Sequence, residues 1–171
     1  MLSPNFGLKG TCFYDILQQM GMKIVLACDH GGYALKEKVK SWLTEAGHEV
    51  QDFGCYSAES VDYPDYALPA AQALAKGQAD RGVFICTTGI GVSICANKVR
   101  GVRCALCCDP MTARMTREHN DTNALAMGAG VVGESLAREI LFTWLTTSFS
   151  EAARHQRRID KISAFEGEIL K

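Results

Sequence analysis

The segment Gly82-Val83-Phe84-Ile85-Cys86-Thr87-Thr88-Gly89-Ile90-Gly91-Val92-Ser93 passes from an apolar run into a cysteine, two threonines and a Gly-x-Gly turn. The apolar part predicts a buried parallel strand that ends at Cys86, and a helix is predicted over residues 92–98. The first N–H groups of a helix have no partner within it and the helix dipole is positive there, so this turn suits an anion. A thiol at that position has a lowered pKa, which makes Cys86 a candidate thiolate near neutral pH.

Spacing argues against three other loop chemistries. A dinucleotide-binding fingerprint needs a third glycine at position 94, which is Ile94, and a Walker loop needs a Gly-Lys-Ser/Thr that this segment does not contain. A phosphatase of the Cys-x5-Arg type needs arginine at position 92, which is Val92. A purely structural Cys86 stays open, because free cysteine is commonly a small buried residue.

The same alternation of apolar runs and helical patterns continues along the chain. Strands are predicted at residues 23–28, 49–53, 83–86, 102–107 and 123–127. Helices are predicted at residues 33–46, 65–76, 92–98, 111–118 and 134–146, with a last one that begins near Ser150. The pattern predicts an α/β fold, a three-layer α/β/α Rossmann-like (flavodoxin-like) domain with a five-stranded parallel sheet and an extra C-terminal helix. We expect one domain over residues 22–171, with residues 1–21 as an N-terminal extension outside the fold.

Polar and acid-base groups follow three of the predicted strands. They are Asp29-His30, Cys86-Thr87-Thr88 and Asp109. Ligand sites of parallel sheets lie at the carboxyl ends of the strands, so these groups are expected at one edge of the sheet. The sequence therefore predicts acid-base chemistry beside an anion-binding turn.

Composition argues against several classes of binding partner and cofactor. The formal net charge of −1 gives no electrostatic case for nucleic acid or an anionic membrane, and no run approaches the ~20 apolar residues of a membrane span. Eight cysteines, several of them in apolar strand-like runs, fit reduced thiols in a cytoplasmic protein. Cys104 and Cys107 have CxxC spacing without a second pair, and a strand would point them to opposite faces. We therefore expect neither a metal nor an organic cofactor.

Two histidines and two arginines complete the candidate groups. Arg154 and Arg158 are four residues apart, so both lie on one face of a helix and can meet one phosphate; a solvated basic face is the alternative. His119 lies at the end of a predicted helix, where it can act in a site or interact with the helix dipole. His155 is expected to be structural.

Several motifs in this order resemble the ribose-5-phosphate isomerase B (RpiB/LacAB) family of sugar-phosphate isomerases, from Met22 to the C-terminus. They are Asp29-His30-Gly31, Asp62-Tyr63-Pro64, Cys86-Thr87-Thr88-Gly89-Ile90-Gly91, Ala96-Asn97-Lys98, His119-Asn120-Asp121 and Arg154-His155-Gln156-Arg157-Arg158. The resemblance implies cofactor-free interconversion of D-ribose 5-phosphate and D-ribulose 5-phosphate through a cis-enediolate. It also implies a homodimer with a shared active site, and leaves open whether two dimers form a tetramer.

The resemblance assigns roles to residues. Cys86 would be the general base that moves a proton between C2 and C1, assisted by Thr88, and His119 with Asp29 would open the furanose ring. The substrate-binding residues would be His30, Tyr63, Thr87, Gly89, Ile90, Gly91, Asn120, Arg154 and Arg158. Among these, His30 and the two arginines would hold the phosphate.

Two positions depart from the family pattern. Thr87 stands where glycine is common, and Gly130 stands where an arginine often supplies a third phosphate ligand. A side chain at position 87 is expected to crowd C1 of the sugar. Two alternatives therefore stay open: an isomerase of another sugar phosphate, of the galactose 6-phosphate or allose 6-phosphate type, and a non-catalytic sugar-phosphate-binding homologue.

Overall fold

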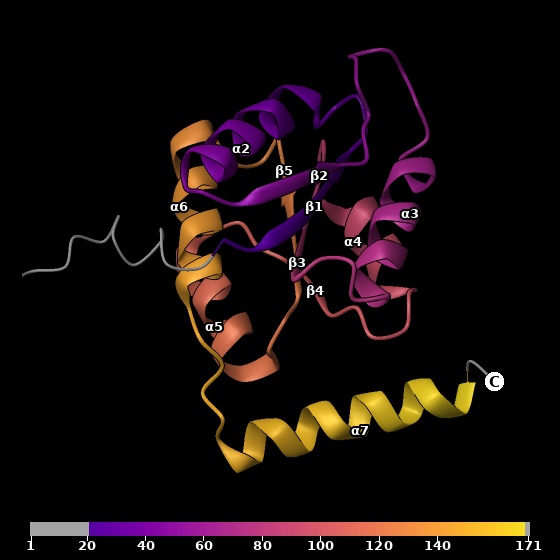
Figure 1. Cartoon of the computed structure of the whole chain (residues 1–171), viewed down its shortest axis with the longest axis vertical. Coiled ribbons are helices and arrows are strands. Elements are labelled where there is room, and N and C mark those ends of the chain that lie inside the picture. Colours follow the sequence, from indigo (N-terminus) through magenta and orange to yellow (C-terminus); the bar gives the residue numbers. More distant parts are fainter. Residues whose placement is uncertain (1–20, 170–171) are drawn as a thin grey trace, which may run out of the picture.

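Five parallel strands form the central sheet, as the sequence predicts. The computed structural model describes residues 21–169, so residues 1–20 of the predicted extension lie outside it. The strands are β1 (Lys23–Cys28), β2 (Glu49–Asp52), β3 (Arg81–Cys86), β4 (Cys104–Leu106) and β5 (Ala124–Gly128). The helices are α2 (Tyr33–Glu45), α3 (Pro64–Ala75), α4 (Ile90–Asn97), α5 (Pro110–Asn120), α6 (Glu134–Thr146) and α7 (Ala153–Ile169). The three-layer α/β/α class is confirmed (Figure 1).

The strand order is β2-β1-β3-β5-β4, so β4 is an edge strand and β5 lies between β3 and β4. The chain moves outward from β1 to β2, crosses back to β3, continues to β4 and returns to β5. Because crossovers between parallel strands are right-handed, each change of direction moves the next helix to the other face. Accordingly α2, α5 and α6 cover one face, and α3 and α4 cover the other. The first change of direction lies between β1 and β3, and the carboxyl ends of strands at such a point are where ligands bind in these sheets.

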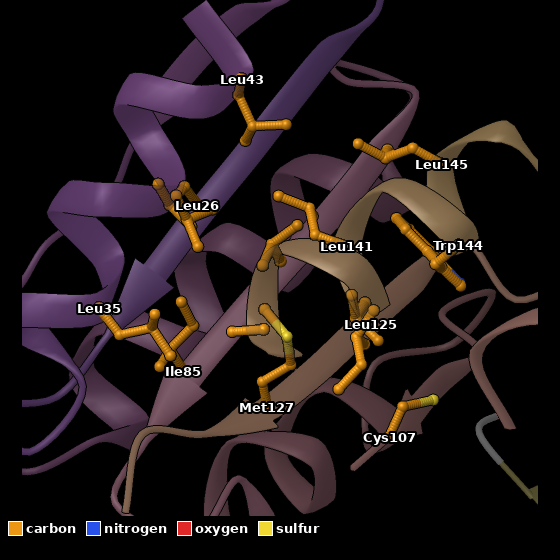
Figure 2. Packing of buried hydrophobic residues seen from close by; sticks show 14 of the residues in the cluster. Leu26, Leu35, Leu43, Ile85, Cys107, Leu125, Met127, Leu141, Trp144 and Leu145 are labelled. Atoms are coloured by element: carbon orange, nitrogen blue, oxygen red, sulfur yellow. The ribbon is translucent and has the colours of Figure 1, made fainter. Parts of the chain in front are cut away.

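Alternation along the central strands supplies a core on each face of the sheet. In β3, Val83 and Ile85 face α2 and α6, whereas Phe84 and Cys86 face α3 and α4. Figure 2 shows the larger cluster, in which Trp144 and Leu141 of α6 pack on Leu125 and Met127. Cys107 belongs to this cluster and Cys104 packs on the opposite one, so the prediction that the CxxC cysteines point to opposite faces is confirmed.

Most predicted boundaries lie within two residues of the observed ones. The helix opening at Asp109-Pro110 is confirmed, because the Asp109 carboxylate accepts the Thr112 N–H at 2.8 Å. The fourth strand is shorter than predicted. The backbone N–H of Arg103 donates to the Asn123 side chain at 2.8 Å instead of joining the ladder at the strand start.

Helix α7 follows the completed sheet as an extra element, as predicted. It crosses the molecule near the end of α5, on the side where the strands begin (Figure 1). Of its own side chains, Ile159 is buried, whereas Ile162 and Phe165 are exposed. None of the helices in residues 21–169 is long and apolar enough to cross a membrane.

Candidate active site

The loop after β3 holds Cys86 at the start of α4. The Cys86 side chain is 5% exposed, and its Sγ accepts the backbone N–H of Gly89 at 3.0 Å. Gly89 has φ of +78°, and a Cβ there would lie 2.5 Å from Leu106 Cδ1 and 2.8 Å from the Met127 carbonyl carbon. Only glycine fits this position, and its tight turn lets α4 begin at Ile90, two residues earlier than predicted. The sulfur thus lies at a helix N-terminus and accepts one of the N–H donors there.

The loop after β1 lies beside the Cys86 loop because β1 and β3 are neighbours in the sheet. The backbone N–H of Asp29 donates to the Ile85 carbonyl at 3.2 Å, and the Asp29 carboxylate accepts the Gly32 N–H at 3.0 Å. His30 Nδ1 accepts the Val61 N–H at 3.2 Å. A neutral His30 therefore carries its proton on Nε2, which is the nitrogen left to donate to a ligand.

Tyr63 comes from the loop before α3 and covers the first turn of α4. A Cβ on Gly91 would lie 2.8 Å from Tyr63 Cζ, so the ring lies directly against the Gly91 backbone. Next to it, the Thr88 hydroxyl accepts the Ile90 N–H at 3.3 Å. The structure thus brings Tyr63 and the predicted loop residues 87–91 together around the Cys86 turn.

A second cluster of predicted residues lies where α5 ends and α7 begins. The ring centroids of His119 and His155 are 4.2 Å apart, and the Arg154 Nε–H donates to His155 Nε2 at 3.1 Å. A cavity of about 400 Å³ opens beside them, between α7 and the edge of the sheet. Its lining includes Asn120 and Arg158.

The two clusters lie at opposite ends of the sheet. Cys86 pairs with Gly128 at the end of β5, whereas His119 and Asn120 precede the start of β5 at Ala124. Four residues of strand separate these levels, which is ~13 Å at about 3.3 Å per residue. One chain therefore does not bring His119, Asn120 or the arginines of α7 to its own Cys86.

Cys104 and Cys107, the pair with CxxC spacing, both have raised thiol pKa values. Burial raises the pKa of the Cys104 thiol, and burial together with nearby Asp109 raises that of Cys107 to about 11, despite a hydrogen bond with Thr112 that lowers it. High thiol pKa values disfavour the thiolate that would bind a metal. Within residues 21–169 no group of three or more His, Cys, Asp or Glu side chains is placed to hold a metal ion.

Comparison with known proteins adds to this geometry. Residues 24–162 match the family model described as Ribose/Galactose Isomerase. The chain belongs to the ribose/galactose isomerase family. It is 47% identical over 144 residues to ribose-5-phosphate isomerase B of Escherichia coli (strain K12), an alignment that covers 84% of this chain and 96% of the relative.

Solved structures of similar proteins agree with this assignment. The chain matches a Clostridium thermocellum ribose-5-phosphate isomerase B with a TM-score of 0.84 and 50% identity, over 86% of this chain and 99% of that one. It also matches a Mycoplasma genitalium ribose-5-phosphate isomerase B with bound ribulose-5-phosphate, with a TM-score of 0.82 and 38% identity, over 85% and 97% of the two chains.

The two departures from the ribose/galactose isomerase pattern are in contact with each other. A Cβ on Gly130 would lie 3.3 Å from Thr87 Cγ2, and one on Gly31 would overlap the Thr87 hydroxyl. The backbone N–H of Gly130 also donates to the Thr87 carbonyl at 2.8 Å. Thr87 therefore packs between the β1–α2 and β5–α6 loops, in space that two glycines leave open.

Two features of this family site were missed at the level of sequence. Gly31 makes room for Thr87, and the backbone of Val61 orients His30. A glycine directly after Asp29-His30 was a signal for the first, because such a position suits close packing. No residue type signals the second, since any backbone N–H can donate.

Proposed function

We propose that the chain interconverts D-ribose 5-phosphate and D-ribulose 5-phosphate through a cis-enediolate, with Cys86 as the general base. The observation that carries this proposal is the Cys86 sulfur at the N-terminus of α4, beside the Asp29-His30 loop at the change of direction of the sheet. Family membership supports the reaction class, and the relatives named ribose-5-phosphate isomerase B support the substrate. A charged sugar phosphate as substrate also favours a cytoplasmic location.

The proposed chemistry moves protons and needs no redox partner. After ring opening by His119 and Asp29, the Cys86 thiolate takes the proton on C2 of the aldose, and the electrons form the C1–C2 double bond and an oxyanion at O1. The N–H groups at the start of α4, with Thr88, stabilise that charge. The Cys86 thiol then returns the proton to C1, while the O2 proton is transferred to O1, directly or through solvent, which gives the C2 carbonyl and the C1 hydroxyl of the ketose.

The separation of the two residue clusters supports a homodimer with a shared site. His119, Asn120, Arg154 and Arg158 of one protomer would complete the site around Cys86 of the other. Exposed apolar side chains border the Cys86 loop and give the partner a surface to cover: Ile90 is 52% exposed, Ile94 54% and Leu106 43%. Pairing of two dimers into a tetramer stays open.

Turnover tests the substrate assignment. Purified protein in EDTA is expected to convert ribose 5-phosphate to ribulose 5-phosphate, with a higher kcat/KM than for galactose 6-phosphate or allose 6-phosphate. A higher kcat/KM for a six-carbon substrate would replace the pentose assignment. Binding of sugar phosphates without turnover would favour the non-catalytic homologue, for which Thr87 and Gly130 are the motivating residues.

Mixing two inactive variants tests the shared site. Cys86→Ala and His119→Asn are each expected to be inactive, and heterodimers formed by refolding a mixture carry one intact site. Random pairing in a two-fold symmetric dimer then restores about one quarter of wild-type activity. A mixture that stays as inactive as either variant, although heterodimers form, contradicts the shared site.

A further inference from the structure

His155 is enclosed by polar partners near the start of α7. It is 4% exposed, and its two ring nitrogens both have partners: Nδ1 lies 2.8 Å from Ser150 Oγ and Nε2 lies 3.1 Å from Arg154 Nε. A guanidinium can only donate, so Nε2 must be unprotonated to accept this bond. The single ring proton of a neutral His155 is then on Nδ1 and donates to Ser150. The two contacts together fix one tautomer.

The third neighbour of His155 is the ring of His119. The two ring planes are tilted by 46° at a centroid distance of 4.2 Å. The groups that face His155 are His119 of α5, Arg154 and Arg158 of α7, and the Glu118 carbonyl, which accepts the Ser150 N–H at 3.1 Å. Burial lowers the pKa of His155, and the neighbouring His119, Arg154 and Arg158 lower it further, whereas a hydrogen bond to the Glu118 backbone raises it. The neutral form is therefore the stable one near neutral pH.

We propose that His155 is a positioning residue, whose neutral ring orients the Arg154 guanidinium for the substrate phosphate and supports the ring of His119. This inference rests on the proposed function, which gives Arg154 and His119 their roles. The bond to His155 uses the Nε–H alone, so four of the five guanidinium N–H groups stay available to a phosphate. Arg154 is otherwise exposed, and an exposed arginine loses much side-chain entropy when it binds unless its geometry is fixed beforehand.

Protonation of His155 would reverse this arrangement. Nε2 would become a donor that faces the Arg154 donor, and a new positive charge would lie beside His119. The fixed tautomer is lost as the pH falls through the pKa of His155, so KM for the sugar phosphate rises at acidic pH. A histidine with a purely structural role gives no such dependence of KM.

Two substitutions at position 155 separate positioning from packing. His155→Phe keeps a ring against His119 but removes the acceptor for Arg154, and we expect KM for ribose 5-phosphate to rise about tenfold with a smaller change in kcat. His155→Gln keeps an acceptor oxygen close to the place of Nε2, so KM rises only about twofold. Arg157→Ala, an exposed neighbour on α7, is the matched control and leaves KM at the wild-type value.

A double-mutant cycle with Arg154→Ala tests whether His155 affects KM through Arg154. If His155 acts through Arg154, His155→Phe raises KM no further in the Arg154→Ala background. Equal KM values for the Gln and Phe variants, or additive effects in the cycle, overturn the proposal. If His155→Phe does not fold, the pH profile of KM is the test. The rise of KM at acidic pH must be smaller in His155→Gln than in wild type, and identical profiles overturn the proposal.

Failure of the proposed function is distinguishable from failure of this inference. If wild-type protein does not turn over ribose 5-phosphate, the proposed function fails, and the same variants are then compared by calorimetric binding of inorganic phosphate. His155→Phe must weaken phosphate binding about tenfold and His155→Gln about twofold. Equal affinities for wild type and His155→Phe overturn the positioning role independently of catalysis.

Discussion

Replacing Gly31 with alanine tests how Thr87 is accommodated beside the Cys86 turn. The new Cβ would overlap the Thr87 hydroxyl, and it would lie 3.2 Å from Thr87 Cβ and 3.3 Å from the Thr87 nitrogen. Gly31 is not among the residues with positive φ, so alanine meets no backbone strain and the cost is steric. Overpacking of this kind costs about 1–3 kcal/mol of unfolding free energy. Thr87 is exposed, so its side chain can rotate to move the hydroxyl away, but the close contacts to its Cβ and nitrogen remain and require a shift of the loop that holds Cys86. For this reason kcat/KM should fall as well.

The double variant Gly31→Ala/Thr87→Gly gives the decisive comparison. Removal of the threonine side chain takes away the overlapping atoms and leaves only the backbone nitrogen at 3.3 Å. Urea unfolding should therefore show a favourable coupling of about 1–2 kcal/mol between the two changes. Gly167→Ala is the control, because its Cβ would meet nothing closer than Arg100 Nη2 at 3.4 Å. Additive effects of Gly31→Ala and Thr87→Gly would refute this account of the packing.

Three further predictions concern stability. Lys36→Met removes a fully buried ammonium that donates to Asp52 at 2.9 and 3.0 Å, and it should lower the urea unfolding free energy by about 3 kcal/mol. Burial raises the pKa of Asp52, but hydrogen bonds from Lys36, Lys40 and Gly54 outweigh this effect and hold the pKa below its usual range. Burial lowers the pKa of Lys36, but its bonds to acidic groups outweigh this effect and raise the pKa. The stabilisation by Asp52 is thus present above about pH 4 and is lost as pH falls through its lowered pKa. The stabilisation by Lys36 is present below about pH 10 and is lost as pH rises through its raised pKa. A urea midpoint that does not fall at either extreme would contradict both. Asp109→Ala removes the cap of α5 and should cost about 1 kcal/mol, measured by the same method, with Asp109→Asn retaining most of the stability.

The parts of the fold that were predictable are those set by local pattern. Apolar strand runs, the glycine stops and the Asp109-Pro110 opening each depend on neighbouring residues, and all three appear where the sequence indicates. The position of β5 between β3 and β4 depends on which long-range pairing buries most surface. Because β4 and β5 are both short apolar runs, no sequence pattern distinguishes the edge strand from the inner one. Strand order at this edge therefore needed the structure.

The candidate site divides in the same way. Residues 86–91 were recognisable because a strand, a thiol and two glycines lie within a few positions of each other. The contact between Thr87 and the glycines at 31 and 130 joins three separate loops, so it could not be read from sequence. His155 was expected to be structural from sequence, and only its contacts with Arg154 and His119 suggest a further role.

The most direct test of the account is the rate of ribose 5-phosphate isomerisation by wild-type protein and by Cys86→Ala, both in EDTA. Alanine keeps the buried backbone of the β3 end but removes the sulfur that accepts the Gly89 N–H. Wild type should turn over ribose 5-phosphate, and kcat of Cys86→Ala should be about 100-fold or more lower, with unfolding by urea little changed. A folded Cys86→Ala protein that retains wild-type kcat would contradict general-base catalysis by Cys86.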